Sequence, residues 1–330
     1  MSGTISDMAK ILVTGGGGYI GSFMVRGLFE KGYEVVVLDS LERGNADVIP
    51  ENTPFYKGKV GDRELLGKVI QENPFEAVIH FAGYISMKES MENPSLYFEQ
   101  NTYETLQFLE NLRSFDKKHI IFSSTAGVYG NPERVPIHED DRKDPTNPYG
   151  ESKLMVERIL HWYNNIYGVN YAVLRYFNAC GASLDGSLGE KHSPETHIIP
   201  VALEALKEEK EFILYGTDYN TPDGTCVRDY VHVLDLVNAH MLALEKIINN
   251  PGGYTYNVGT GKGYSNKEIV GMIEEVTGRK LNYNERERRP GDADELVADV
   301  TRIKDDLGFE PQYSDLRTII ETAWKWHNRV

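Results

Sequence analysis

Residues 11–21 read ILVTGGGGYIG, a short apolar run followed by a run of glycines. An apolar run without polar alternation, such as Ile11 to Val13, is typical of a strand buried on both faces of a sheet. The next segment, 19–31, is amphipathic and long enough to form a helix. The stretch therefore predicts a buried strand, a tight turn and a helix in direct succession.

Three glycines of this stretch, Gly15, Gly18 and Gly21, follow the pattern Gly-x-x-Gly-x-x-Gly. The first allows the tight turn, the second lets backbone N–H groups approach a pyrophosphate, and the third lets the helix pack closely on the strand. The positive end of the helix would face this anion. Strand, glycines and helix in this order predict a dinucleotide-binding loop.

Strand and helix patterns continue to alternate along the first half of the chain. Further apolar runs lie at 34–38, 77–79, 119–122 and 171–174, and amphipathic segments lie at 63–72, 97–114 and 149–167. Crossover helices between parallel strands produce this alternation. We therefore predict an α/β fold with a doubly wound parallel sheet.

The pattern changes after about Asn178. Residues 181–195 are rich in Gly, Ser and charged side chains, and 215–225 form a polar loop. We expect a first domain at 1–178 that binds the dinucleotide. The remainder, 179–330, is expected to form mainly a second, smaller α/β domain that binds the substrate.

We do not expect a single position in the sequence to separate the two domains. Residues 230–249 have a helical pattern, and 254–258 form a strand candidate followed by Gly-Thr-Gly. A strand here allows the chain to return to the first sheet. We therefore assign 230–260 to the first domain as an expected later contribution.

Asp39 ends the second predicted strand, eighteen residues after Gly21. A carboxylate at this place can accept hydrogen bonds from both hydroxyls of a ribose and repels a 2′-phosphate. This favours NAD over NADP as the cofactor. Arg43, four residues further on, is either a partner for a 2′-phosphate or a solvated loop charge.

The composition argues against several other classes of protein. With 35 Lys and Arg against 50 Asp and Glu, the formal net charge is −15, which opposes binding to nucleic acid or to an anionic membrane surface. No apolar run approaches the ~18 residues that a spanning helix needs, and no secretory signal is visible. Cys180 and Cys226 have neither disulfide-framework nor metal-ligand spacing. We expect a soluble, cytoplasmic protein without a bound metal.

Tyr149 and Lys153 are four residues apart at the start of a predicted helix, so their side chains share one helix face. A phenol has a pKa near 10, but a nearby ammonium group and the positive end of a helix both favour the phenolate. The pair is therefore a candidate acid and base. Without further context, it would be read as a surface contact of a lysine with an aromatic ring.

Ser123, Ser124 and Thr125 follow the predicted strand that ends at Phe122. Their hydroxyls are expected at the carboxyl edge of the sheet, where doubly wound folds bind ligands. The alternative is that they only hydrogen-bond the backbone of a turn.

Over essentially its whole length, the chain resembles the extended short-chain dehydrogenase/reductases, in their NAD-dependent epimerase/dehydratase branch. The resemblance rests on VTGGGGYIGS at 13–22, FAG at 81–83, YGESKL at 149–154, LRYFN at 174–178 and DGTCVRDYVHV at 223–233. It implies a Rossmann fold for the first domain.

Within this family the chain resembles the isomerases that invert C4 of a UDP-hexose, which implies interconversion of UDP-galactose and UDP-glucose on a tightly held NAD. By this resemblance, Tyr149 takes the proton from the sugar 4-hydroxyl as the C4 hydride moves to the nicotinamide. Lys153 would hold the nicotinamide ribose and lower the pKa of Tyr149, and Thr125 would hydrogen-bond the same sugar oxygen. The 4-keto sugar would then turn over and take the hydride back on its other face.

The resemblance also implies the binding residues. For NAD they are Gly15, Gly18, Tyr19, Ile20, Gly21, Asp39, Val60, Phe81, Ala82, Gly83, Asn101, Ser123, Tyr149, Lys153 and Phe177. For the UDP-hexose they are Thr125, Asn178, His197, Ile198, Tyr215, Arg228, Arg289, Asp292 and Leu296. Arginine suits a diphosphate because its planar guanidinium can pair two oxygens at once.

Four positions depart from the family pattern. Thr125 stands where serine is more common, and Lys59 replaces an aspartate that commonly holds the adenine, which leaves the backbone of Val60 as the candidate contact. Ile85 replaces a lysine found near the pyrophosphate in some members. Leu296, at the position that limits room around the sugar 2-substituent, leaves the use of N-acetylated sugars open.

Three other functions are alternatives to this one. A 4,6-dehydratase would need carboxyl groups after the active hydroxyl, where Ala126 and Gly127 stand. A 4-epimerase for UDP-N-acetylhexosamines or uronates would differ only in the pocket. A non-catalytic NAD-binding sensor would not need Tyr149, Lys153 and Thr125 together.

The predicted helices 97–114 and 149–167 carry apolar residues beyond one core-facing stripe. Relatives pair through these two helices, so we expect a homodimer. A broad apolar face could equally be core.

Overall fold

The computed structural model describes residues 9–191, 194–288 and 292–329. The chain forms two compact units, and each unit is built from three separate segments. Unit 1 comprises Met1–Val128, Lys143–Arg175 and Val237–Tyr256, and unit 2 comprises Tyr129–Arg142, Tyr176–Leu236 and Asn257–Val330.

The described strands and helices have the following bounds. The strands are β1 (Lys10–Thr14), β2 (Glu34–Asp39), β3 (Phe55–Lys57), β4 (Ala77–His80), β5 (His119–Thr125), β6 (Asn170–Tyr176), β7 (Asn178–Cys180), β8 (Phe212–Tyr215), β9 (Val227–His232), β10 (Gly253–Val258), β11 (Gly263–Ser265), β12 (Tyr283–Arg286) and β13 (Glu295–Leu296). The α-helices are α1 (Tyr19–Glu30), α2 (Arg63–Glu72), α3 (Met87–Glu92), α4 (Pro94–Tyr97), α5 (Glu104–Ser114), α6 (Pro148–Tyr167), α7 (Ile198–Lys207), α8 (Val233–Asn249), α9 (Asn266–Thr277), α10 (Thr301–Leu307) and α11 (Leu316–His327). Other helical segments are the 3-10 turns η1 (Ala46–Val48) and η3 (Ala126–Tyr129) and the π-helix η2 (Phe98–Tyr103).

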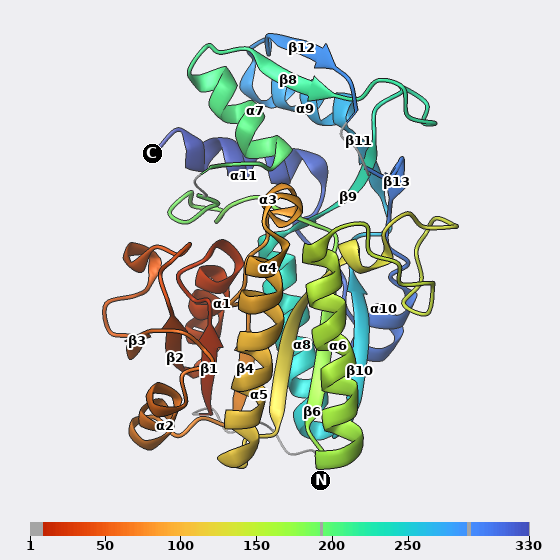
Figure 1. Ribbon diagram of the computed structural model, residues 1–330. Coiled ribbons are helices and arrows are strands. Elements are labelled where there is room, and N and C mark those ends of the chain that lie inside the picture. The colour runs from red at the N-terminus through yellow and green to blue at the C-terminus, as the bar shows by residue number, and fades with distance from the viewer. Residues whose placement is uncertain (1–8, 192–193, 289–291, 330) are drawn as a thin grey trace. The chain divides into compact units, whose positions relative to one another are not determined.

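A seven-stranded sheet in the order β10-β6-β5-β4-β1-β2-β3 confirms the predicted α/β class (Figure 1). Strand β1 lies between β2 and β4 and pairs in parallel with both, so that Ile11 is in register with Val35 and with Ala77. The strand order reverses at β1, because β2 and β3 extend to one side and β4, β5 and β6 to the other. A doubly wound sheet binds its ligand at the carboxyl ends of the strands at such a reversal.

Helices cover both faces of this sheet. In Figure 1, α5 and α6 lie side by side against the strands. The buried side chains Leu109 of α5 and Leu160 of α6 belong to one core cluster with Leu12 of β1. On the other face, α1 packs against α8, since a Cβ on Gly27 would meet side-chain atoms of Val237 and Met241.

Two parts of unit 1 differ from the prediction. The expected single helix at 97–114 starts earlier, because Pro94 begins α4, and it is interrupted by the π-helix η2. The short edge strand β3 was not predicted, since three residues that remain partly exposed carry too weak a pattern. Late in the chain, β10 pairs with β6 at the edge of this sheet.

The expected helix at 230–249 is wrong at its start. Residues 230–232 belong to β9, and the helix α8 begins only at Val233. The reason is tertiary, because β9 pairs with β7, β11 and β13, and Tyr230 is in register with Asn178. These neighbours supply the backbone partners that a helix would otherwise provide.

Unit 2 has its own core around α7, α9 and α11, with residues such as Leu203, Ile269 and Ile320 fully buried. The segment 129–142 belongs to this unit although it lies within the expected first domain. Ile137 explains its position, because its N–H donates to Val297 O (2.8 Å) and its carbonyl accepts from Asp299 N (2.8 Å).

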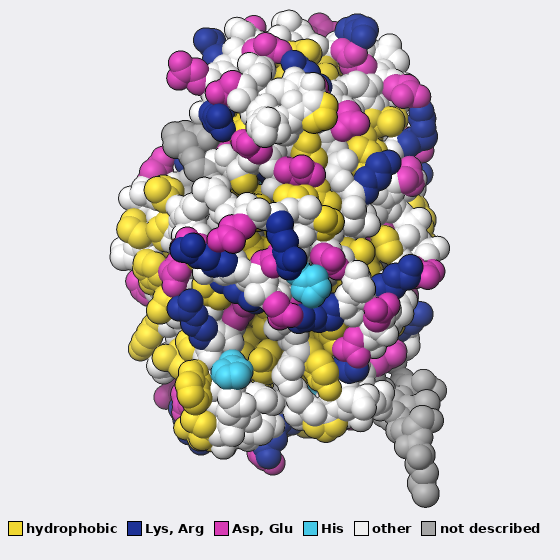
Figure 2. Space-filling model, turned by 90° about the vertical axis from the view of Figure 1, so that its right-hand side faces the viewer, with side chains coloured by type: hydrophobic (Ala, Val, Ile, Leu, Met, Phe, Trp, Pro, Cys, Tyr) yellow, Lys and Arg dark blue, Asp and Glu magenta, His cyan; other side chains and the backbone are white. Residues whose placement is uncertain are grey.

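No helix within the described residues combines the length and the apolar character needed to cross a bilayer. On the face drawn in Figure 2, acidic and basic side chains are interspersed, and neither sign forms a continuous patch.

The contact between α1 and β1 leads to a test of the fold. A Cβ on Gly21 would overlap the carbonyl oxygen of Gly15 and approach its carbonyl carbon to 2.8 Å. We expect Gly21→Ala to lower the free energy of unfolding by about 1–3 kcal/mol, because backbone cannot move aside cheaply. Thermal and urea unfolding measure the change.

Gly271→Ala is the matched control, because Gly271 also lies in a helix but has nothing within 4 Å of its Cβ position. This variant should gain about 0.5–1 kcal/mol. Equal effects of the two substitutions would contradict the close packing of α1 on β1.

Candidate active site

The glycine loop connects β1 to α1 at the carboxyl edge of the sheet. Gly15 has a φ of +74°, and a Cβ there would lie 2.7 Å from Ala82 N, so only glycine fits this turn. Gly18 is the N-cap of α1, and neither a capping side chain nor an acidic residue occupies the first turn. The backbone N–H groups at this helix end and the helix dipole therefore suit an anion such as a pyrophosphate.

Asp39 is buried at the end of β2, and backbone amides fix its carboxylate. Oδ2 accepts a hydrogen bond from Gly17 N (2.9 Å) and Oδ1 accepts one from Leu41 N (2.8 Å). Each carboxylate oxygen has a second lone pair, so the group can still accept two ribose hydroxyls. The geometry fits the predicted role in NAD binding.

Arg43, which the sequence left open as a phosphate partner, already has an acidic neighbour. Its Nη2 lies 2.5 Å from Glu89 Oε1, and its guanidinium stacks 4.8 Å from the ring centre of Tyr84. The Tyr84 hydroxyl in turn donates to Glu42 (2.9 Å). The charge of Arg43 is thus largely compensated, which favours the solvated-loop interpretation over binding of a 2′-phosphate.

His80 of β4, a buried residue that the sequence did not single out, links the end of β1 to α5. Its ring nitrogens lie 2.7 Å from Thr14 Oγ1 and 3.0 Å from Thr105 Oγ1. Burial, and in smaller part the charge of Lys153, lowers the pKa of His80 to about 3, so the imidazole is neutral at physiological pH. The one sequence signal was a polar residue that ends the apolar run before residues 81–83.

Asn101 lies in the π-helix η2 and joins three segments around the site. Its Oδ1 accepts from Tyr84 N (2.7 Å), and its Nδ2 donates to Tyr84 O (2.9 Å) and to Ser152 Oγ (3.0 Å). A π-helical turn often occurs at a functional site because it redirects a side chain. Here it turns a buried amide toward Gly83, whose Cβ position would lie 3.0 Å from Asn101 Oδ1.

The predicted catalytic residues meet where β5 ends and α6 begins. Asn147 caps α6 through its side chain, which accepts from Gly150 N (2.9 Å), and Pro148 follows in the first turn. The Lys153 ammonium donates to Ser123 O (3.0 Å). Thr125 forms a side-chain hydrogen bond with Tyr149. The structure therefore brings together the residues that the sequence predicted at this edge.

Burial shifts both titrating groups toward their neutral forms. Burial raises the pKa of Tyr149, and the hydrogen bond from Thr125 acts in the opposite direction. Burial also lowers the pKa of Lys153 to about 8. The expected lowering of the pKa of Tyr149 by Lys153 is therefore not seen in the chain by itself. A cationic group bound beside the phenol would lower this pKa.

Three further residues predicted to bind the cofactor lie on different segments of the chain. Val60 is buried at the turn before α2, and Ile20 lies in the first turn of α1. Phe177, which belongs to unit 2, is buried, and its N–H donates to Val258 O (3.1 Å).

Among the residues predicted to bind the sugar nucleotide, Arg228, Asp292 and Leu296 lie together in unit 2. Arg228 Nη2 is 3.9 Å from Asp292 Oδ1, and Leu296 pairs in register with Arg228. Tyr219, which was not predicted, donates from its hydroxyl to Asp292 (3.4 Å) and is almost fully buried. An aromatic residue in a polar loop was its only sequence signal.

The other predicted sugar-nucleotide residues of unit 2 lie on different elements. His197 is the N-cap of α7 and Ile198 its first residue, and Asn178 begins β7. Tyr215 is exposed at the end of β8. Arg289 lies outside the described residues.

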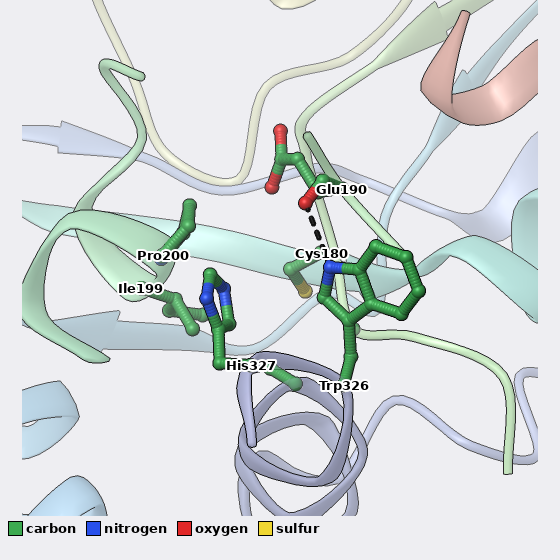
Figure 3. A pocket seen from close by; sticks show the side chains of 8 residues that line it. Cys180, Glu190, Ile199, Pro200, Trp326 and His327 are labelled. Carbon is green, nitrogen blue, oxygen red and sulfur yellow. Dashed lines mark hydrogen bonds between the residues drawn. The ribbon is translucent and has the colours of Figure 1, made fainter. Parts of the chain in front are cut away.

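Within the described part of unit 2, Glu190, Glu195 and His197 place possible metal-ligand atoms within 4.8 Å of one another. His197 Nδ1 already pairs with Glu190 Oε1 at 2.6 Å. A small cavity of about 10 Å³ lies beside Glu190 and is lined also by Cys180, Trp326 and His327 (Figure 3). It has room for about one water molecule, so it is too small for a nucleotide sugar.

The chain matches the NAD dependent epimerase/dehydratase family over residues 11–259. It is 47% identical over 321 residues to a UDP-glucose 4-epimerase of Streptococcus mutans, an alignment that covers 96% of each chain.

Solved structures have the same fold. The UDP-glucose 4-epimerase of Brucella ovis in complex with NAD is 44% identical, with a TM-score of 0.93 over 96% of this chain and 97% of that one. The UDP-glucose 4-epimerase of Bifidobacterium longum in complex with NAD+ and UDP is 36% identical, with a TM-score of 0.92 over 97% and 98% of the two chains.

The burial of Lys153 leads to a test by pH. Because the pKa of Lys153 falls from 10.5 to about 8 on folding, its charge opposes folding below pH 8. We expect Lys153→Met to stabilise the protein at pH 7 by up to ~3 kcal/mol while it abolishes activity. The gain should shrink as pH rises from about 8 to 10.5, because the folded wild type then carries a neutral lysine.

Thermal unfolding without cofactor, recorded between pH 7 and 10.5, measures this gain. Lys88→Met is the control, since Lys88 is 86% exposed and its removal should have little effect at any of these pH values. A loss of stability in Lys153→Met at pH 7 would contradict the assignment of a destabilising buried charge.

Proposed function

We propose that the chain, which belongs to the NAD dependent epimerase/dehydratase family, interconverts UDP-galactose and UDP-glucose. It is an isomerase that inverts C4 of the hexose through a 4-keto intermediate. The observation that carries this function is the meeting of Tyr149, Lys153 and Thr125 at one edge of the sheet, where the glycine loop also lies.

The cofactor is NAD, and the residues of unit 1 fit it. Its pyrophosphate is assigned to the amide-lined start of α1 and its adenosine ribose to Asp39, whose oxygens are held by Gly17 and Leu41. NAD bound there would supply the acceptor for the C4 hydride and the donor for its return. Lys153, with its donor atom at the end of β5, is assigned to the nicotinamide ribose.

The proton of the sugar 4-hydroxyl passes to Tyr149 in this proposal. The phenol of Tyr149 is hydrogen-bonded to the hydroxyl of Thr125. Thr125 orients the same sugar oxygen and favours the ionised phenol. The ammonium of Lys153 adds a positive charge on the same helix face, which compensates the negative charge that develops on Tyr149.

We assign the UDP part of the substrate to unit 2. Arg228 offers a planar guanidinium to the diphosphate, and its side chain is mostly buried. Asp292 and Leu296 lie beside it, and Asn178, His197, Ile198, Tyr215 and Arg289 are the further candidates from the sequence. In the same proposal the dinucleotide is bound by unit 1.

Two properties of the whole protein complete the proposal. We assign it to the cytoplasm, in line with its two buried cysteines, Cys180 and Cys226, which are not joined in a disulfide. We also propose a homodimer. Its interface would be formed by an exposed apolar stripe on α6, comprising Met155, Trp162 and Ile166, with Trp162 60% and Ile166 63% exposed.

This stripe has the properties of an interface. Its members are spaced so that they share one helix face. Tyr103 of η2 is 55% exposed and adds an aromatic ring from the neighbouring helix. Large exposed apolar patches of this kind mark protein interaction sites on soluble proteins.

The first experiment tests the activity. Purified protein incubated with UDP-galactose, without added NAD, should produce UDP-glucose. Tyr149→Phe should still contain bound NAD but lower kcat by at least ~100-fold, because it lacks the phenolic hydroxyl that serves as acid and base. Product analysis by chromatography and the absorbance of protein-bound NADH measure both effects.

Tyr167→Phe is the control, because Tyr167 is an exposed tyrosine at the far end of the same helix. It should keep the wild-type rate. Failure of the wild type to convert UDP-galactose, with conversion of a UDP-N-acetylhexosamine or a UDP-uronate instead, would contradict the proposed substrate.

The second experiment tests the homodimer. Trp162→Glu combined with Ile166→Glu should give a folded monomer, because two carboxylates would be buried without partners in the dimer. Analytical ultracentrifugation of the wild type and of the variant measures the mass. Leu184→Glu, at an exposed apolar residue of unit 2, should remain dimeric. A monomeric wild type would contradict the proposal.

A further inference from the structure

A buried ion pair between Glu157 and Arg175 joins α6 to β6. Arg175 of β6 donates from Nη2 to Glu157 Oε2 (2.6 Å) and from Nε to Glu157 Oε1 (3.0 Å). The Ser124 hydroxyl donates to the same Oε1 at 2.5 Å. Only 8% of the Glu157 side chain and 5% of the Arg175 side chain are exposed. None of these three residues has a role in the proposed reaction.

The position of this network relative to the catalytic residues suggests a role. Tyr149, Lys153 and Glu157 follow one another at intervals of four residues, so they lie on one face of α6. Each of them contacts one residue of the segment 123–125 at the end of β5. The three contacts are Tyr149 with the Thr125 side chain, Lys153 with Ser123 O, and Glu157 with the Ser124 hydroxyl.

These contacts differ in how firmly they can hold the helix. The contacts of Tyr149 and Lys153 are single hydrogen bonds from side chains that must also act on substrate and cofactor. Glu157, by contrast, is fixed by a two-point pair with Arg175, whose strand lies inside the sheet next to β5. A planar guanidinium that binds both carboxylate oxygens fixes orientation as well as distance.

A contribution to folding stability does not by itself explain the presence of this buried ion pair. Taking both charges out of water costs much of what their attraction returns, and apolar residues of similar volume often serve folding equally well. A gain in geometric precision would explain it better, since small displacements of catalytic groups cost large factors in rate.

We propose that Ser124, Glu157 and Arg175 are positioning residues for the reaction, which hold α6 so that Tyr149 faces Thr125 and Lys153 faces Ser123. The inference rests on the proposed epimerase function. The network acts through the helix and touches neither substrate nor cofactor.

The experiment compares variants that disturb the network to different degrees. Ser124→Ala removes one hydrogen bond, Glu157→Gln removes the charge, and Glu157→Leu with Arg175→Met replaces the pair by apolar side chains. For each purified variant, kcat and KM for UDP-galactose, the pH profile of kcat/KM, bound NAD and thermal unfolding are measured. Arg158→Gln is the matched control, because it removes an exposed charge from the same helix.

The expected result is a loss in kcat with little change in KM. Ser124→Ala should lower kcat about 10-fold, and Glu157→Gln and the double variant about 100-fold, the range that a misplaced catalytic group produces. The acidic limb of the pH profile should move to higher pH, because a displaced Thr125 no longer stabilises the ionised phenol of Tyr149 through its hydrogen bond. Arg158→Gln should match the wild type in every measurement.

A purely structural network would behave differently. The variants would then unfold at lower temperature, while the folded fraction kept the wild-type kcat and pH profile, and this result would overturn the inference. If Glu157→Gln does not fold, Ser124→Ala and the double variant decide between the two results. An inactive wild type would instead contradict the proposed function, so the two failures are distinguishable.

Discussion

The close packing of α1 on the end of β1 is the constraint on which the rest of the structure depends. Gly15 and Gly21 lie where side chains would overlap backbone, so the strand, the turn and the helix can approach one another only without Cβ atoms. Since β1 lies between β2 and β4, this turn also places Asp39 on one side and residues 81–83 on the other. This backbone contact lies where the strand order reverses, which is the place where doubly wound sheets bind their ligands.

The part of the site on α6 contains buried charged groups that are unfavourable for folding unless they are compensated. Lys153 and Glu157 both carry charge inside the protein, one turn apart on the same helix. Burial lowers the pKa of Lys153, whereas Glu157 is compensated by Arg175 and Ser124. The compensated charge of Glu157 can hold the helix firmly, whereas the uncompensated charge of Lys153 leaves that side chain able to react.

Much of the fold could be predicted because its signals are local. The apolar strands, the amphipathic helices, the glycine loop and Asp39 lie in short segments whose spacing has a direct physical meaning, and the predicted sheet and the family are confirmed. NAD as the cofactor also follows from this local pattern and agrees with the family. The roles of the individual site residues stay predictions, although Tyr149, Lys153, Thr125 and Ser123 lie together as expected.

The sequence by itself determined the parallel sheet, the dinucleotide loop and the pairing of Tyr149 with Lys153, because turns and helix faces depend on neighbours along the chain. Only the tertiary structure decided that 230–232 form a strand, that 129–142 join unit 2, and that Arg43 pairs with Glu89. It alone brought Glu157 to Ser124 and Arg175 and made His80 neutral. The physical reason is that partners distant in sequence, and the exclusion of water around them, set strand pairing, ion pairing and pKa.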